Sequence, residues 1–344
     1  LGGAVMCGVV MFLISWVWAT TAIVLMLALH FYIGQREIET NWGDLRSGLA
    51  FERARKNLWV IETEYQHPKN WRPMVLTMSG AGDTRRHLAI YGHWLTSGHG
   101  IQTLGQVIEG TLPAMIQRRA NQRDVLRRFI SEQEVTAFSA IVVAESVGEG
   151  ITSLVQAHGL GGLEPNTVLL GWPTNPERHR EFSELLRTIA ELQRNVILVH
   201  STKGDEEVWS PPLGTIDVWW RGRVNGPLLL LLGHLLTKNH GWRNRRIRLM
   251  RIVAKEAARE EVCKHLESLA EQARIDAECL VLVDEAPVQR IHRESAHAAV
   301  VLLGLDLPDS PDDDASFMSG VEVLVGGFRR AILVRSEDRV TLES

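Results

Sequence analysis

Ten short apolar runs in two successive sets of five limit how this chain can fold. Each run has the length of a strand, shows little apolar–polar alternation, and is separated from the next by enough residues for a helix. Such strands are buried on both faces, as in a parallel sheet covered by helices. The runs lie at 74–80, 101–110, 140–146, 166–173 and 195–201, then at 215–220, 247–254, 278–285, 299–308 and 330–336. The sequence therefore predicts an α/β protein with two tandem, doubly wound parallel sheets.

The two sets resemble copies of one unit, because their closing runs are similar. In the first set "VLLGWP" precedes "VILVHS", and in the second "VLLGLDLP" precedes "AILVRS" at nearly the same separation. Internal repeats of this size usually reflect duplicated units packed together. We therefore expect a first α/β subdomain at 67–205 and a second at 206–344.

The N-terminal residues predict a membrane segment. Residues 1–34 contain no Asp, Glu, Lys or Arg, and about 20 apolar helical residues cross a bilayer. Residues 14–33 supply a complete span, with Trp16 and Trp18 suited to the interface, and residues 1–13 are interpreted as the truncated end of an earlier helix. A signal peptide would need a basic leader and a cleavage pattern, and a buried core helix usually keeps a polar stripe.

Basic residues follow the predicted span directly and favour a cytoplasmic location for the chain after about residue 35. These residues are Arg36, Arg46, Arg53, Arg55 and Lys56. The protein is thus expected to be integral to a plasma or inner membrane. A connector at 35–66 should contain an amphipathic helix at 51–61, because apolar residues recur there with the helical period.

The sequence contains no catalytic motif, so we expect no enzyme. GxxxxGK[ST], GxSxG and HExxH are absent, and "GLGG" at 159–162 ends a helix, whereas a phosphate loop opens one. His93 and His99 lack a third ligand nearby, which predicts no metal site. The cysteines, Cys7, Cys263 and Cys279, lack disulfide or zinc spacing.

One generic pocket is expected at the carboxyl ends of the strands, where the winding of a doubly wound sheet reverses. If the first and fourth strands are neighbours, Ser79, Gly80 and Ala81 face Gly171 and Trp172. The glycines would admit a phosphate and the indole could stack on a base, so ATP or ADP is the candidate ligand. The alternative is that these residues only form turns and pack the core.

Two arginine clusters, at 118–128 and 243–251, could contact anionic headgroups or lie on solvated faces with acidic partners. The net charge of -4 disfavours nucleic acid as a partner. The acidic stretch at 308–314 is interpreted as a solvated loop.

Five segments in order resemble the cation-chloride cotransporters. The apolar N-terminal run is followed by "NWGD", "KNWRP", "GLGGLEPNTVLLGWP", "GTIDVWW" and "AILVRS", which look like the last membrane helices and C-terminal domain of that family. "GLGG", "NTV" and "GWP" are closer to the potassium-chloride branch, and a prokaryotic relative is the other identification.

The resemblance implies a secondary transporter of the amino-acid permease superfamily that moves chloride with potassium, sodium or both in an electroneutral symport. It implies a cytosolic domain like two fused universal stress protein modules, which regulates transport and forms a homodimer. The ion-binding residues would lie upstream of Leu1. The stress-protein nucleotide pattern G-x2-G-x9-G[ST] does not follow either fourth strand.

Two other functions fit the same residues. One is a membrane-tethered, nucleotide-binding signalling protein built from stress-protein modules. The other is an amino-acid permease relative that carries this domain.

Overall fold

The computed structural model of the chain describes residues 6, 10–35, 45–63, 70–80, 85–96, 98–202, 211–308, 310–337 and 340. Contacts divide the chain into two compact units, Leu1–Asn57 and Leu58–Ser344. The first unit contains α2 (Trp16–Gln35) and most of α3 (Leu45–Thr63), which includes the helix predicted at 51–61. The predicted span at 14–33 overlaps α2, yet among the described residues no helix combines the length and apolar character that crossing a bilayer requires. The truncated helix predicted at 1–13 lies mostly outside the described residues.

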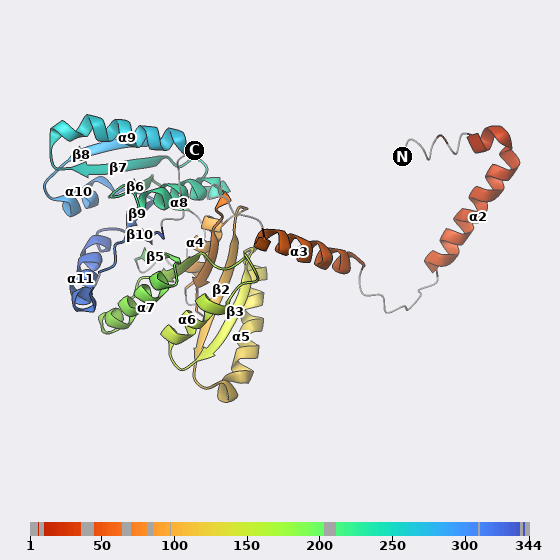
Figure 1. Ribbon diagram of the computed structural model, residues 1–344, viewed down its shortest axis with the longest axis horizontal. Coiled ribbons are helices and arrows are strands. Elements are labelled where there is room, and N and C mark those ends of the chain that lie inside the picture. The colour runs from red at the N-terminus through yellow and green to blue at the C-terminus, as the bar shows by residue number, and fades with distance from the viewer. Residues whose placement is uncertain are drawn as a thin grey trace. The chain divides into compact units, whose positions relative to one another are not determined.

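The second unit is built on ten strands, one for each predicted run (Figure 1). The first set forms β1 (Met74–Met78), β2 (Ile101–Glu109), β3 (Phe138–Ala144), β4 (Thr167–Gly171) and β5 (Asn195–Ser201). The second set forms β6 (Ile216–Trp219), β7 (Ile247–Val253), β8 (Ala277–Val283), β9 (Val300–Gly304) and β10 (Arg330–Arg335). The expected α/β class is confirmed.

The strands form one sheet, which corrects the prediction of two separate sheets. Their order is β3-β2-β1-β4-β5-β10-β9-β6-β7-β8. Within each set all pairs are parallel, and β5 joins β10 antiparallel, from Arg330 opposite Ser201 to Arg335 opposite Val196. Each set alone would leave its fifth strand at an edge with unpaired N–H and C=O groups, and pairing the two edges satisfies these groups.

Eight helices of the described second unit cover the sheet, four on each face. One face carries α4 (Arg86–Thr96), α5 (Leu112–Glu132), α8 (Gly226–Lys238) and α9 (Arg259–Gln272). The other carries α6 (Val147–Ala157), α7 (His179–Glu191), α10 (Pro287–Glu294) and α11 (Asp314–Val325). Short 3-10 turns are η2 (Pro176–Arg178), η3 (His240–Trp242), η4 (Glu256–Ala258) and η5 (Pro311–Asp313). Helices in equivalent chain positions therefore cover the same face in both sets.

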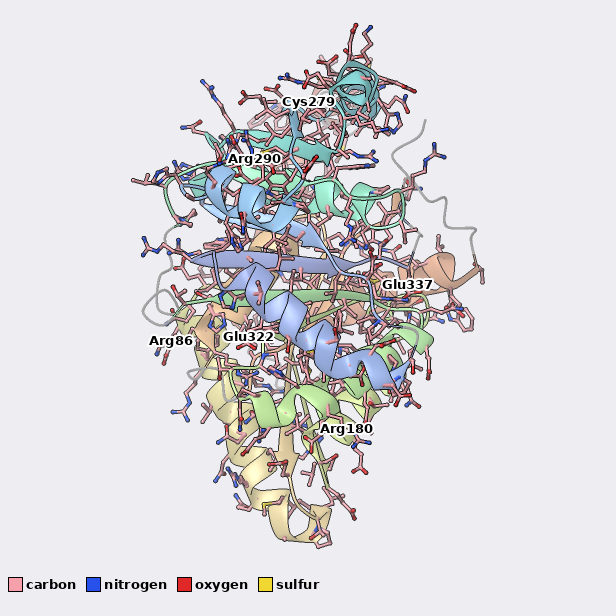
Figure 2. The ribbon with its side chains drawn as sticks, turned by 90° about the vertical axis from the view of Figure 1, so that its left-hand side faces the viewer. Arg86, Arg180, Cys279, Arg290, Glu322 and Glu337 are labelled. Carbon is pink, nitrogen blue, oxygen red and sulfur yellow. The ribbon has the colours of Figure 1, made fainter. Side chains whose placement is uncertain are left out.

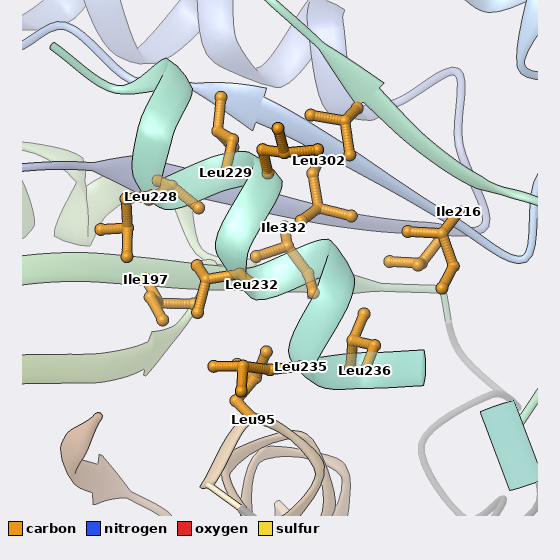
Figure 3. Packing of buried hydrophobic residues seen from close by; sticks show 14 of the residues in the cluster. Leu95, Ile197, Ile216, Leu228, Leu229, Leu232, Leu235, Leu236, Leu302 and Ile332 are labelled. Carbon is orange, nitrogen blue, oxygen red and sulfur yellow. The ribbon is translucent and has the colours of Figure 1, made fainter. Parts of the chain in front are cut away.

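Helix α8 packs where the two sets meet and is apolar on nearly all sides. Its leucines contact strands of both sets, including Ile197 of β5 and Ile332 of β10, and Leu235 lies against Leu95 of α4 (Figure 3). A helix of this composition is stable only when it is buried on most sides. Equivalent helices also meet on the opposite face, where α7 contacts α11.

Candidate functional site

The strand order reverses between β1 and β4 in the first set and between β6 and β9 in the second. Crevices at the carboxyl ends of strands with such a reversal are the usual ligand sites of doubly wound sheets. The condition on which the predicted pocket depended is met, because β1 pairs with β4 in parallel, with Val75 opposite Thr167.

The first switch point brings together the predicted residues that the structure describes. Ser79 and Gly80 follow β1, Gly171 ends β4, and Trp172 comes next; Ala81 lies outside the described residues. Gly80 has φ 65°, a left-handed conformation that glycine adopts without strain. The Ser79 side chain is fully buried, and its Oγ has no hydrogen-bond partner among the described groups.

Two basic residues that the sequence analysis did not select also lie at this point. A Cβ at Gly171 would lie 3.3 Å from Leu88 Cδ1 and 3.8 Å from Arg85 Nη1, so the Arg85 guanidinium is close to the Gly171 backbone. Burial, assisted by the charge of Arg85, lowers the pKa of His87 to about 4. His87 is therefore neutral near pH 7, and Arg85 supplies the positive charge.

Trp172 packs against α7. Its ring lies 6.1 Å from that of His179 and 6.2 Å from that of Phe182. These contacts with His179 and Phe182 support the interpretation that Trp172 packs the core. A base could stack only on the part of the indole that the two rings leave uncovered.

The second switch point contains a cavity of about 470 Å³. Its polar lining comes from four places in the chain: Asn225 before α8, Asp306 after β9, Arg335 and Ser336 at the end of β10, and Arg187 and Glu191 on α7. Sequence reasoning missed this site. The repeat could have indicated it, because "AILVRS" places Arg335 where "VILVHS" has His200.

Asn225 fixes one side of the cavity by joining three backbone segments. Its Nδ2 donates to Leu305 O at 3.2 Å and to Asp306 Oδ1 at 3.0 Å. Its Oδ1 accepts from Ser336 N at 2.8 Å. Since Asn225 is only 8% exposed, these bonds hold the ends of β9 and β10 in place beside the start of α8.

Helix α7 supplies the opposite wall and is tied to α11 by a buried ion pair. Arg187 donates through Nη1 to Asp314 Oδ1 and through Nη2 to Asp314 Oδ2, and Ser183 Oγ also donates to Asp314 Oδ1 at 2.8 Å. The hydrogen bonds from Arg187 hold the pKa of Asp314 below its ordinary value. Asp314 is 6% exposed, which corrects the interpretation of residues 308–314 as a solvated loop throughout.

Arg335 is partly buried beside the cavity and forms an ion pair with Glu337. Figure 2 labels Glu337 just beyond the end of β10. Burial lowers the pKa of Arg335, and the nearby Asp306 carboxylate opposes that shift. The guanidinium thus stands in a less solvated environment than a surface arginine.

The other sequence-predicted features lie outside these two points. "GLGG" follows α6 and precedes β4, with Gly159 at φ 143° and Gly161 at φ 57°, which confirms that it ends a helix. Arg119 Nε donates to Ile141 O on β3, and Arg248 pairs with Asp217, so each arginine cluster includes a member bound to a strand of the sheet. Within the described ranges, no three His, Cys, Asp or Glu residues are placed to hold a metal ion.

Comparison with known proteins finds one family match and several similar folds. The family model "Solute carrier family 12" matches residues 85–199 and 210–337. The crystal structure of the cytoplasmic domain of a prokaryotic cation chloride cotransporter is similar, with TM-score 0.57 and 19% identity over 78% of this chain and 97% of that chain. A universal stress protein from Archaeoglobus fulgidus matches with TM-score 0.50 and 9% identity over 78% of this chain and 98% of that chain. At these identities the two structures establish a shared fold.

Proposed function

Because the chain belongs to solute carrier family 12, the cation-chloride cotransporters, we propose that residues 67–344 are the cytoplasmic regulatory domain of an electroneutral symporter of chloride with potassium, sodium or both. The family match carries this proposal, since it includes strands of both sets. The shared fold with a cotransporter cytoplasmic domain supports it. We further propose that 67–205 and 206–344 are two stress-protein-like subdomains of this domain.

Membrane attachment is the second part of the proposal. Residues 1–34 lack charged side chains, and this composition is what supports a transmembrane end at 14–33, since no helix of the described residues has by itself the length and apolar character of a span. The charged helix α3 would then connect the bilayer to the regulatory domain, and the ion-binding residues would lie upstream.

Chloride-dependent uptake of radioactive rubidium tests the transport proposal. The complete transporter should take up rubidium only with chloride present, and removal of residues 45–344 should change the rate. Exchange of residues 45–344 for an unrelated domain of similar size serves as the matched control. Absence of chloride-dependent uptake in every form would refute the symport, and competition by amino acids would favour a permease relative instead.

We also propose a homodimer, because cytoplasmic domains of this family are expected to associate. Light scattering of the detergent-purified protein should give twice the mass of one 38.6 kDa chain after detergent is subtracted. A monomer over the micromolar range would contradict the dimer.

Nucleotide binding at the first switch point is a second candidate function. The partnerless buried Ser79 Oγ and the Arg85 guanidinium beside Gly171 favour it. Calorimetry with ATP should show binding that weakens in Arg85→Gln, and Arg86→Gln, an exposed neighbour labelled in Figure 2, is the control. ATP binding that Gly171→Val abolishes, in a protein without transport, would favour the signalling alternative.

A further inference from the structure

Helix α5 lies over one edge of the sheet and carries an excess of positive charge. It packs on β3, the terminal strand of the sheet at that edge (Figure 1). Five arginines and two acidic residues lie on it: Arg118, Arg119, Arg123, Arg127, Arg128, Asp124 and Glu132. The whole chain has a net charge of -4, so the charge of α5 is opposite in sign to that of the protein.

The equivalent helix of the second set, α9, shows that the fold does not require a basic helix at a sheet edge. Helix α9 packs on β8, the terminal strand of the other edge, and connects β7 to β8 as α5 connects β2 to β3. It carries four acidic residues and two basic ones, Arg259 and Lys264. Both basic residues are paired, Arg259 with Glu256 and Lys264 with Glu260. A helix of the opposite net charge therefore packs equally well at this position.

Most of the arginines on α5 have no partner in the part of the chain that the structure describes. Arg119 donates to a carbonyl of β3, and Arg128 donates to a carbonyl of the preceding turn. Arg118, Arg123 and Arg127 form no hydrogen bond or ion pair with a described residue. Guanidinium groups without carboxylates beside them create a positive surface potential, which attracts an anionic partner.

Two exposed apolar side chains lie on the same face of α5 as two of these arginines. Leu112 and Ile116 are 55% and 62% exposed. Leu112, Ile116, Arg123 and Arg127 follow one another at separations of 4, 7 and 4 residues, which is the spacing of one helix face. These four residues, the α5 stripe, extend about 22 Å along the helix at about 1.5 Å per residue. Helices at a membrane interface combine such residues, because apolar side chains enter the acyl boundary while arginines reach the headgroups.

We propose that the α5 stripe docks on an anionic lipid bilayer. Arg123 and Arg127 contact headgroup phosphates, and Leu112 and Ile116 enter the apolar boundary. The docking depends on the proposed location of the domain beside a membrane, which family membership supports, and it needs no transport activity. The cytoplasmic leaflet of a membrane is negatively charged. The apolar half of the stripe favours a bilayer over a nucleic acid, whose backbone would contact only the charged half.

Co-flotation of residues 58–344 with lipid vesicles tests the docking without residues 1–34, whose apolar side chains would bind lipid themselves. This unit can be studied alone because the clusters of buried apolar residues in the described chain lie within it, and the cytoplasmic domain of a similar protein has been crystallised. It should float with phosphatidylcholine vesicles that contain about 30% phosphatidylserine and should not float with phosphatidylcholine alone. Raising the salt from about 0.1 M to about 1 M should release it, because the Debye length falls from about 10 Å to about 3 Å.

Two matched pairs of variants separate the α5 stripe from the rest of the surface. Arg123→Gln with Arg127→Gln should weaken binding to anionic vesicles at least about tenfold, because each arginine near such a surface contributes about fivefold. Arg259→Gln with Lys264→Gln removes the same charge from α9 and should change binding less than about twofold.

The second pair tests the apolar half of the stripe. Ile116→Ser should weaken binding about threefold or more. Leu213→Ser, at a side chain 82% exposed outside the stripe, should leave it unchanged. Equal binding of Ile116→Ser and the unchanged protein would overturn the docking.

The remaining outcomes also decide. Absence of binding to both kinds of vesicle, equal binding to both, or equal losses in the α5 and α9 double variants would overturn the docking. Binding of a single-stranded oligonucleotide that the α5 double variant loses, while its vesicle binding is unchanged, would assign the stripe to nucleic acid instead. If the double variant does not fold, the exposed Arg127→Glu decides, and unchanged vesicle binding in it overturns the docking. A protein that floats with anionic vesicles but shows no chloride-dependent uptake would refute the symport alone.

Discussion

The ion pair between Asp217 of β6 and Arg248 of β7 allows a quantitative prediction of how much a buried charge pair contributes to the stability of the fold. Arg248 donates to Asp217 through Nε at 2.8 Å and Nη2 at 2.5 Å, and Thr215 Oγ1 also donates to Asp217 at 2.6 Å. Asp217 is fully buried. Arg248 Nη2 also donates to the carbonyl of Glu294, near the end of α10, at 3.0 Å. The pair therefore connects two adjacent strands, β6 and β7, with α10.

Asp217→Asn should destabilise the protein strongly, because it leaves the Arg248 charge buried with weaker partners. Removing one member of a buried pair costs about 3–5 kcal/mol. The Arg248 side chain is 17% exposed and retains a 3.5 Å contact with Glu294, so we expect the lower end, about 3 kcal/mol. Replacing both residues, Asp217→Leu with Arg248→Met, should cost about 1 kcal/mol or less, because no unpaired charge remains.

Urea unfolding followed by tryptophan fluorescence measures these changes. The exposed pair Lys264–Glu260, with side chains 71% and 82% exposed, is the matched control, and Glu260→Gln should change stability by less than about 0.5 kcal/mol. The reasoning is refuted if Asp217→Asn costs no more than this control, or if the double replacement is as unstable as the single one.

Three further predictions follow from other contacts. Gly92→Ala should cost about 1–3 kcal/mol, because the new Cβ would lie 2.2 Å from Gln102 Nε2 and 2.5 Å from Thr77 Oγ1. Gly148→Ala in the first turn of α6, where a Cβ meets nothing within 4 Å, should gain about 0.4–1 kcal/mol by restricting the unfolded chain. If the two glycine substitutions shift the denaturant midpoint equally, this reasoning is wrong. The pKa of His87 is lowered to about 4, so the unfolded chain binds the proton more readily and stability should fall as pH drops from about 6.5 to 4; His87→Asn should flatten that part of the stability–pH curve, and a curve of unchanged slope would argue against it. The pKa of Asp314 is lowered, so its ion pair stabilises the protein above the ordinary aspartate pKa and is lost as pH falls through the folded value; Asp314→Asn should therefore lose less stability between pH 7 and pH 3 than the unchanged protein.

Some residues of the two candidate sites could be predicted from a local sequence pattern, and others could not. Ser79, Gly80, Gly171 and Trp172 could be selected from the sequence because each lies at or just after the end of a strand, and strands of a parallel sheet end at a common edge. Arg85 was not selected, since a charged residue beside a helix start is usually solvated. The cavity at the second switch point was missed because Arg187 and Asp306, which both line it, are 119 positions apart and share no motif.

The amino-acid sequence by itself determined where the strands are, that both sheet faces are covered, and that the unit occurs twice. A strand that is buried on both faces needs a continuous apolar run, and such a run can be recognised in the sequence without knowing which strands lie beside it. Only the tertiary structure decided that β5 and β10 join the copies into one sheet and that α7 of one set closes a cavity of the other. Backbone hydrogen bonding at a free strand edge depends little on side chains. The residue pattern therefore does not specify which other strand edge will pair with it.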